Sequence, residues 1–201
     1  MARFTRPISR ILGGLTRPIR YGYRRRFHVD RIQRSVRLHD EDRTDRRRRW
    51  HVLVDLIHEH CPKQDVVVAE LGAREGVTSF HILKYCPQVR IIHAVDLQDC
   101  RHDFVRDRER IDFILGDSAG AAARFADESF DLVFVDADHS ESAVRRDVSA
   151  WLPKLRPGGV IAGHDFGGDR HPGVERAVTD LFRGHAHGVK VDADKVWWTL
   201  R

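Results

Sequence analysis

The sequence has few cysteines and no long apolar run, and both features limit what the protein can be. Its 201 residues include three cysteines, Cys61, Cys86 and Cys100, an odd number with no close pair. This pattern argues against a disulfide framework or a zinc ribbon and favours a reducing, cytoplasmic location. No segment approaches the roughly 20 apolar residues of a membrane-spanning helix. With 41% hydrophobic residues and no internal repeat, the chain fits one compact domain plus an extension.

The beginning of the chain lacks lysine and is poor in acids. Residues 1–50 contain 16 Arg, no Lys and five acids, a net charge of +11, so the remainder carries −6. Pro7, Gly13, Gly14 and Pro18 interrupt any long helix in this part. We therefore expect a basic arm, residues 1–44, attached to an acidic domain, residues 45–201.

Several interpretations of the arm stay open. Apolar residues scattered among arginines are typical of a segment that lies on an anionic membrane surface. The arginines also suit the phosphates of a nucleic acid, and an Arg-rich, acid-poor start is typical of an organelle transit peptide. Otherwise the arm is a solvated tail or folds over its own domain.

The central motif of the domain is VVVAELGAREG, residues 66–76. Its apolar run suits a strand buried on both faces, and Gly72 and Gly76 allow a tight turn before a helix over residues 77–85. A dinucleotide-binding loop needs a glycine where this chain has Arg74, so pyrophosphate would fit poorly. With Glu70 beside the loop, a cationic nucleoside without phosphates fits better. S-adenosylmethionine (SAM) meets both conditions.

Strand and helix patterns alternate along the rest of the domain. A helix is expected over residues 45–60, and strands are expected over residues 89–95, 111–115, 132–135 and 160–163, with helices over 119–125, 141–152 and 173–183 and a turn at 156–159. Two last strands, residues 189–191 and 196–200, are expected to form an antiparallel pair in which Trp197 and Trp198 pack. The pattern predicts an α/β fold with a doubly wound, mostly parallel sheet.

Acidic residues follow several of these strands. Asp96, at the end of the second strand, is placed to accept both ribose hydroxyls of a nucleoside, in preference to capping a helix. Asp117 either accepts from an adenine amino group or caps the next helix. The ends of the fourth and fifth strands carry Asp136, Asp138 and His139, and His164 and Asp165.

These motifs together resemble a class I SAM-dependent methyltransferase. VVAELGAREG, HAVDL, GDS, VFVDADHS and LRPGGVIAGHDF are most similar to the small-molecule O-methyltransferases of the catechol, caffeoyl-coenzyme A and macrolide-sugar type, over roughly residues 66–200. The resemblance implies a Rossmann-like fold. It also implies cofactor-binding roles for Glu70, Gly72, Gly76, Asp96, Asp117, Ser118 and Asp138.

The resemblance also implies a metal site and a catalytic base. Asp136 and Asp165 resemble ligands of a divalent metal, Mg or Mn, with His164 as a third candidate, and His139 resembles the general base of the macrolide-sugar enzymes. Histidine at position 164 departs from the plant enzymes, and imidazole is a poor ligand for magnesium. Either His164 turns away, or a softer metal is preferred, or Asp165 only caps a loop. His139 is otherwise a helix-start histidine that bonds the loop.

The expected function is methyl transfer from SAM to a hydroxyl of a small molecule, a sugar or a phenol, with metal assistance. Alignment of acceptor and methyl supplies much of the rate, and a metal and an imidazole help to remove the proton. Two alternatives remain. One is a nucleic-acid methyltransferase that uses the arm, although the chain lacks an N-P-P-Y-type motif; the other is a non-catalytic SAM-binding scaffold.

Overall fold

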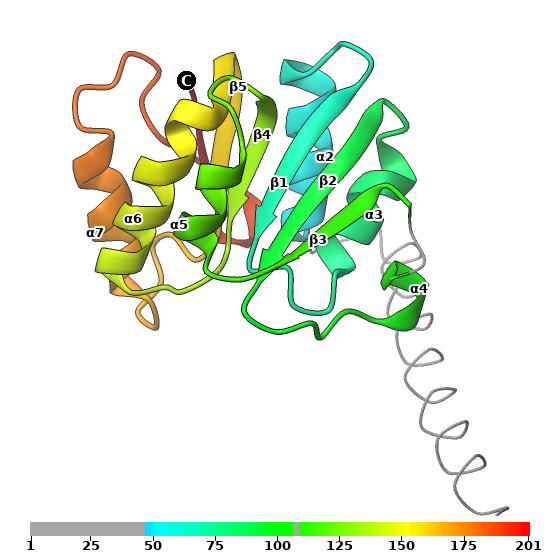
Figure 1. Ribbon diagram of the computed structural model, residues 1–201. Coiled ribbons are helices and arrows are strands. Elements are labelled where there is room, and N and C mark those ends of the chain that lie inside the picture. Colours follow the sequence, from blue (N-terminus) through cyan, green and yellow to red (C-terminus); the bar gives the residue numbers. More distant parts are fainter. Residues whose placement is uncertain (1–46, 107–108) are drawn as a thin grey trace, which may run out of the picture. The chain divides into compact units, whose positions relative to one another are not determined.

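The computed structural model describes residues 47–106 and 109–201 (Figure 1). Residues 46–201 form one compact unit. The basic arm lies outside the described residues, so its division from the domain at residues 44 and 45 stays a prediction.

A seven-stranded sheet forms the centre of this unit, and its order is β3-β2-β1-β4-β5-β7-β6. Strands β1 to β5 pair in parallel, whereas β7 runs antiparallel to both β5 and β6. This topology confirms the predicted doubly wound sheet with its antiparallel ending. The strands are β1 Val66–Leu71, β2 Val89–Asp96, β3 Ile111–Leu115, β4 Phe130–Val135, β5 Leu155–Gly163, β6 Lys190–Val191 and β7 Trp197–Leu200.

Helices cover both faces of the sheet (Figure 1). Alternate residues of β1 explain the two layers, because Val66 and Val68 enter one apolar cluster with α2, α3 and Val105, while Val67, Ala69 and Leu71 enter another with α5, α6 and α7. The helices are α2 Arg49–His60, α3 Val77–Tyr85, α4 Asp103–Arg106, α5 Ser118–Ala121, α6 Glu141–Trp151 and α7 Pro172–Leu181, with 3₁₀ turns at Ala122–Arg124, Leu152–Lys154 and Ala193–Lys195.

Several element boundaries differ from those that the sequence predicts. Residues 156–159 belong to β5 rather than to a separate turn, and the pairing register of β4 and β5 shifts between Phe130 and Leu132 to accommodate them. The helix predicted over residues 119–125 is one α-helical turn followed by a 3₁₀ turn. The short helix α4 carries no strong apolar period and was not expected.

The two tryptophans of β7 pack as the sequence predicts. Trp197 and Trp198 are buried, with 0% and 7% exposure. All three cysteines are free, and only Cys100 is exposed. No helix among the described residues is long and apolar enough to cross a membrane.

Candidate active site

A cavity of about 960 Å³ lies at the carboxyl ends of β1, β2, β4 and β5. The sheet order reverses between β1 and β4, and a parallel sheet binds its ligands at such a reversal. Nine of the eleven predicted site residues line this cavity: Gly72, Asp96, Asp117, Ser118, Asp136, Asp138, His139, His164 and Asp165.

The glycine loop after β1 is fixed by backbone contacts. Gly72 has φ +86°, and a Cβ atom there would lie 2.2 Å from the carbonyl oxygen of Asp136, so β1 and β4 approach this closely only with glycine. The Arg74 N–H donates to Asp96 Oδ2 at 2.7 Å, and the Gln98 N–H donates to Oδ1 at 3.1 Å. Asp96 therefore fixes the backbone of the loop after β1, which lines the cavity.

Asp117, Ser118 and Asp138 line the same cavity and also support local structure. Asp117 caps α5 by accepting from the Gly120 N–H at 2.7 Å, as one of the two predictions for it required. The Ser118 hydroxyl donates to buried Asp147 at 2.6 Å. Asp138 accepts from the Ser140 N–H at 2.8 Å, and this bond is the main reason that the pKa of Asp138 is lowered.

Glu70 and Gly76 do not line the cavity. Glu70 is 2% exposed and accepts a hydrogen bond from the Ser79 hydroxyl, and its burial raises its pKa to about 7. Gly76 has φ +77°, and a Cβ atom there would lie 2.5 Å from the Val105 side chain, so glycine lets α4 pack against the loop. Their proposed contacts with a cofactor stay predictions.

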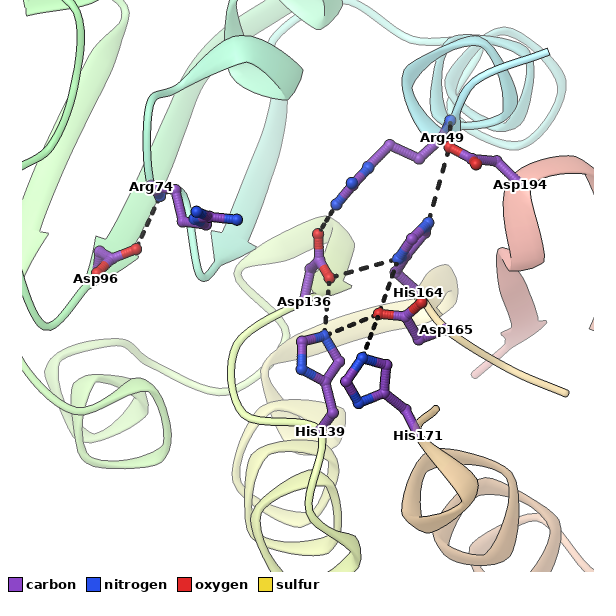
Figure 2. Close-up of polar contacts among 9 residues, drawn as sticks. All are labelled: Arg49, Arg74, Asp96, Asp136, His139, His164, Asp165, His171 and Asp194. Atoms are coloured by element: carbon purple, nitrogen blue, oxygen red, sulfur yellow. Dashed lines mark hydrogen bonds and ion pairs between the residues drawn. The ribbon is translucent and has the colours of Figure 1, made fainter. Parts of the chain in front are cut away.

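Three histidines and two aspartates gather at the ends of β4 and β5 (Figure 2). His139 Nε2 lies 3.5 Å from Asp136 Oδ1 and 3.0 Å from Asp165 Oδ2. His164 Nδ1 lies 3.2 Å from the same Asp165 oxygen and 3.7 Å from Asp136 Oδ1. His171 was not predicted from the sequence, yet its Nε2 lies 4.0 Å from Asp165 Oδ2.

The electrostatics of this cluster follow from its opposite charges. Contact with Asp136 raises the pKa of His139, Asp165 adds to this effect, and burial opposes it. Burial also disfavours ionised Asp165, but the neighbouring His164, His139 and His171 outweigh it and lower the pKa of this carboxyl. Asp165 has φ +63°, a left-handed backbone that Asp tolerates better than most residues.

Helix α2 contributes another residue that was not predicted from the sequence. The Arg49 guanidinium forms an ion pair with Asp136 Oδ2. The Arg49 backbone N–H donates to Asp194 Oδ2 at 2.9 Å, and that oxygen lies 3.7 Å from His164 Nε2. Asp194 therefore connects the start of α2 to the histidine at the end of β5.

The donor atoms fit a divalent cation. Asp136, His164 and Asp165 offer three ligand atoms within 4.8 Å of one another, and so do His139, Asp165 and His171. The buried Nε2 atoms of His139 and His164 have no hydrogen-bond partner of good geometry. Nitrogen donors beside carboxylates suit manganese, iron, cobalt or zinc better than magnesium.

Comparison with known proteins adds sequence evidence to this geometry. Residues 69–166 match the family model described as a methyltransferase domain. The demethylmacrocin O-methyltransferase of Streptomyces fradiae is 32% identical in an alignment of 130 positions that covers 55% of this chain. The chain spans about a third of that relative's length, 32%.

The fold is similar to that of solved methyltransferase structures. A putative caffeoyl-CoA O-methyltransferase from Staphylococcus aureus superposes with a TM-score of 0.63 at 12% identity, covering 89% of this chain and 99% of its own. The MycE methyltransferase of the mycinamycin pathway, in complex with Mg and S-adenosylhomocysteine (SAH), gives 0.53 at 24% identity, covering 75% of this chain and 49% of its own. At these identities the likeness to the solved structures shows the fold.

Proposed function

We propose that this protein is an enzyme that transfers the methyl group of SAM to a hydroxyl of a small molecule, a sugar or a phenol. One observation carries the proposal: the predicted ribose acid Asp96 and the candidate base His139 line one cavity of about 960 Å³. The methyltransferase-domain match and the name of the S. fradiae relative support O-methylation.

In this proposal the loop after β1 and the end of β2 bind the nucleoside. Each Asp96 oxygen accepts one backbone N–H, and because a carboxylate oxygen has two lone pairs, one lone pair per oxygen remains for a ribose hydroxyl. Gly72, Asp117, Ser118 and Asp138 complete the cofactor side. Arg74 occupies the place of a pyrophosphate-binding glycine, so NAD is expected to bind poorly.

His139 accepts the proton of the acceptor hydroxyl. The acceptor oxygen forms a bond with the methyl carbon while the bond from that carbon to sulfur breaks and releases SAH. Asp136 and Asp165 lie 3.5 and 3.0 Å from Nε2, where they stabilise the imidazolium that forms. Asp136, His164 and Asp165 would hold a divalent cation, which when bound would lower the pKa of the acceptor hydroxyl.

The test is a screen of hydroxylated metabolites with methyl-labelled SAM, followed by His139→Ala on the accepted substrate. Turnover is expected to fall about 10²–10⁴-fold, the usual contribution of a general base, while SAM affinity stays unchanged. SAM binding with no turnover on any acceptor would instead support a scaffold. A variant with wild-type turnover would make His164 the next candidate base.

Metal assistance is tested separately by exhaustive chelation. Activity is expected to fall and to return at least as well with Mn²⁺ as with Mg²⁺, because imidazole donors stand beside the two carboxylates. Full activity with elemental analysis showing no metal would contradict this part of the proposal and leave methyl transfer itself intact.

The basic arm completes the proposal as a contact to an anionic membrane surface from the cytoplasmic side. The support is its sequence alone: arginines interspersed with apolar residues and no acid before Asp30.

A further inference from the structure

The imidazoles of His139 and His171 lie side by side and turn toward the same atom, Asp165 Oδ2 (Figure 2). Their ring centroids are 4.2 Å apart with an interplanar angle of 29°. We propose that His139, Asp165 and His171 form a binding site for a zinc-class transition-metal ion, distinct from the position at Asp136, His164 and Asp165, and that this ion inhibits the enzyme.

The spacing of the three ligand atoms suits a tetrahedral ion. With metal–ligand bonds of about 2.0–2.1 Å, two ligands of a tetrahedral zinc lie about 3.3 Å apart. The two distances from Asp165 Oδ2 are 3.0 Å to His139 Nε2 and 4.0 Å to His171 Nε2, on either side of that value. All three ligand atoms lie within 4.8 Å of one another, so movements of up to about 1.5 Å would bring them into the coordination sphere, with a fourth position left for water.

The backbone holds the two histidines together. His139 directly precedes Ser140, the N-cap of α6, and His171 is the N-cap of α7 with Pro172 after it. A Cβ atom at Gly173 would lie 2.9 Å from the His139 carbonyl oxygen, so glycine at this position lets the two helix starts meet. The three ligand atoms thus come from the N-terminal ends of two packed helices, α6 and α7, and from the residues that follow β5.

Among the described residues, the carboxylates of the cluster differ in their pairing with arginine and lysine. Asp136 is already paired with Arg49, but no arginine or lysine of the described chain forms an ion pair with Asp165. His139 Nε2 is buried and, in spite of its short distance to Asp165, has no hydrogen bond of good geometry. A metal ion between the His139 nitrogen and the Asp165 oxygen would take the place of the proton that otherwise lies between the two atoms.

The donor set selects the class of metal. Two imidazole nitrogens and one carboxylate oxygen are typical ligands of zinc, cobalt or nickel, whereas magnesium and calcium prefer oxygen. An ion here would bind the imidazole of His139, which the proposed function assigns to proton removal. Inhibition rests on that proposed function; binding of the ion does not.

Binding is measured on the full-length protein after metal removal, by calorimetry with Zn²⁺ and by the visible absorption of Co²⁺, without SAM or acceptor. His171→Gln and His139→Gln are each expected to weaken binding more than about tenfold, because even changes outside the ligand shell cost 10–100-fold in affinity. His164→Gln, which alters the neighbouring position, is expected to have the smaller effect. His187→Gln, an exposed histidine outside the cluster, is the matched control and is expected to bind as the wild type does.

Wild-type Zn²⁺ affinity in His171→Gln, or a greater loss in His164→Gln than in His171→Gln, would overturn the site. Melting curves check that each variant folds; if His171→Gln does not, His139→Gln decides in the same way. Once an acceptor is known, Zn²⁺ is expected to inhibit the wild type and to inhibit His171→Gln less. Equal inhibition of both would overturn the inhibitory role, whereas failure to find an acceptor would contradict only the proposed function.

Discussion

Arg49 and Asp136 form an ion pair that connects the first turn of α2 with the end of β4. The Arg49 side chain is 37% exposed, whereas that of Asp136 is only 11% exposed. The arginine thus brings one positive charge to an oxygen that the proposed cation also needs. Figure 2 shows the guanidinium approaching Asp136 from the side opposite His139.

We expect Arg49 and a divalent cation to compete for Asp136. Arg49→Gln removes the charge and keeps much of the side-chain length, so Mn²⁺ should bind more tightly than to the wild type, measured by calorimetry on metal-free protein. Arg47→Gln is the matched control, because Arg47 pairs with Asp55 and Asp192 and does not line the cavity. Equal or weaker Mn²⁺ binding by Arg49→Gln would show that the arginine does not compete.

Asp96→Ala is expected to weaken SAM and SAH binding by about 10–100-fold, since a hydrogen bond to a charged group contributes about 1.5–3 kcal/mol. The variant loses both the proposed ribose contact and the bonds to the Arg74 and Gln98 amides. Asp99→Ala provides the comparison, because Asp99 pairs with Arg101 outside the cavity lining. Comparable wild-type affinities for NAD and SAM would contradict the cofactor assignment.

Stability is expected to fall as the pH rises from about 4.5 to 7. Burial raises the pKa of Glu70 to about 7 and that of Asp147 to about 6. Well below their ordinary pKa values of 4.5 and 3.8, both carboxyls are protonated in the folded and the unfolded chain. Between their ordinary and raised pKa values only the unfolded chain releases the protons, so rising pH favours unfolding.

Glu70→Gln tests this directly. The wild type should lose more unfolding free energy than the variant between pH 5 and pH 8, by a difference on the order of 1–3 kcal/mol, measured by urea unfolding without metal. Other groups titrate in the same window, but they are common to both proteins and cancel in the comparison. Parallel curves for the two proteins would show that Glu70 is ionised inside the fold.

A chain that starts at Asp45 is expected to fold and to bind SAM as the full-length protein does, because the described cavity is lined entirely by residues from Arg49 onward. Circular dichroism and calorimetry measure both properties. Full-length protein should bind anionic vesicles, the shortened chain should not, and added salt should weaken the binding. An insoluble shortened chain would make the arm part of the fold.

The periodic elements of the fold were predictable from the sequence, and the irregular ones were not. The helix Val77–Tyr85 and the strand Ile111–Leu115 match their predicted bounds, because burial on fixed faces imposes a period that the sequence displays. Residues 156–159 look like a turn because of Pro157 and two glycines. They stay in β5 because β4 pairs with Leu155 before them and Val160 after them, and because Gly158 and Gly159 bond to Arg201.

The candidate site was predictable where its residues directly follow strands. Asp96, Asp136 and Asp165 meet in one cavity because parallel strands present their carboxyl ends at one edge. Arg49 and His171 carry no such signal: one lies in the first turn of a helix and the other precedes Pro172, and only tertiary packing brings them to Asp136 and Asp165. Glu70 lies within β1 and not after it, so its side chain is buried and accepts a hydrogen bond from the Ser79 hydroxyl.

The reversed direction of β7 has a practical consequence. Arg201 exchanges backbone hydrogen bonds with Gly158 and Gly159 in the first half of β5, so the chain ends at the edge of the sheet opposite the carboxyl ends that line the cavity. Figure 1 shows this end beside β5. A label or surface tether attached after Arg201 would therefore leave the cavity facing solution, which makes immobilised protein suitable for measuring the affinities of cofactors and metal ions.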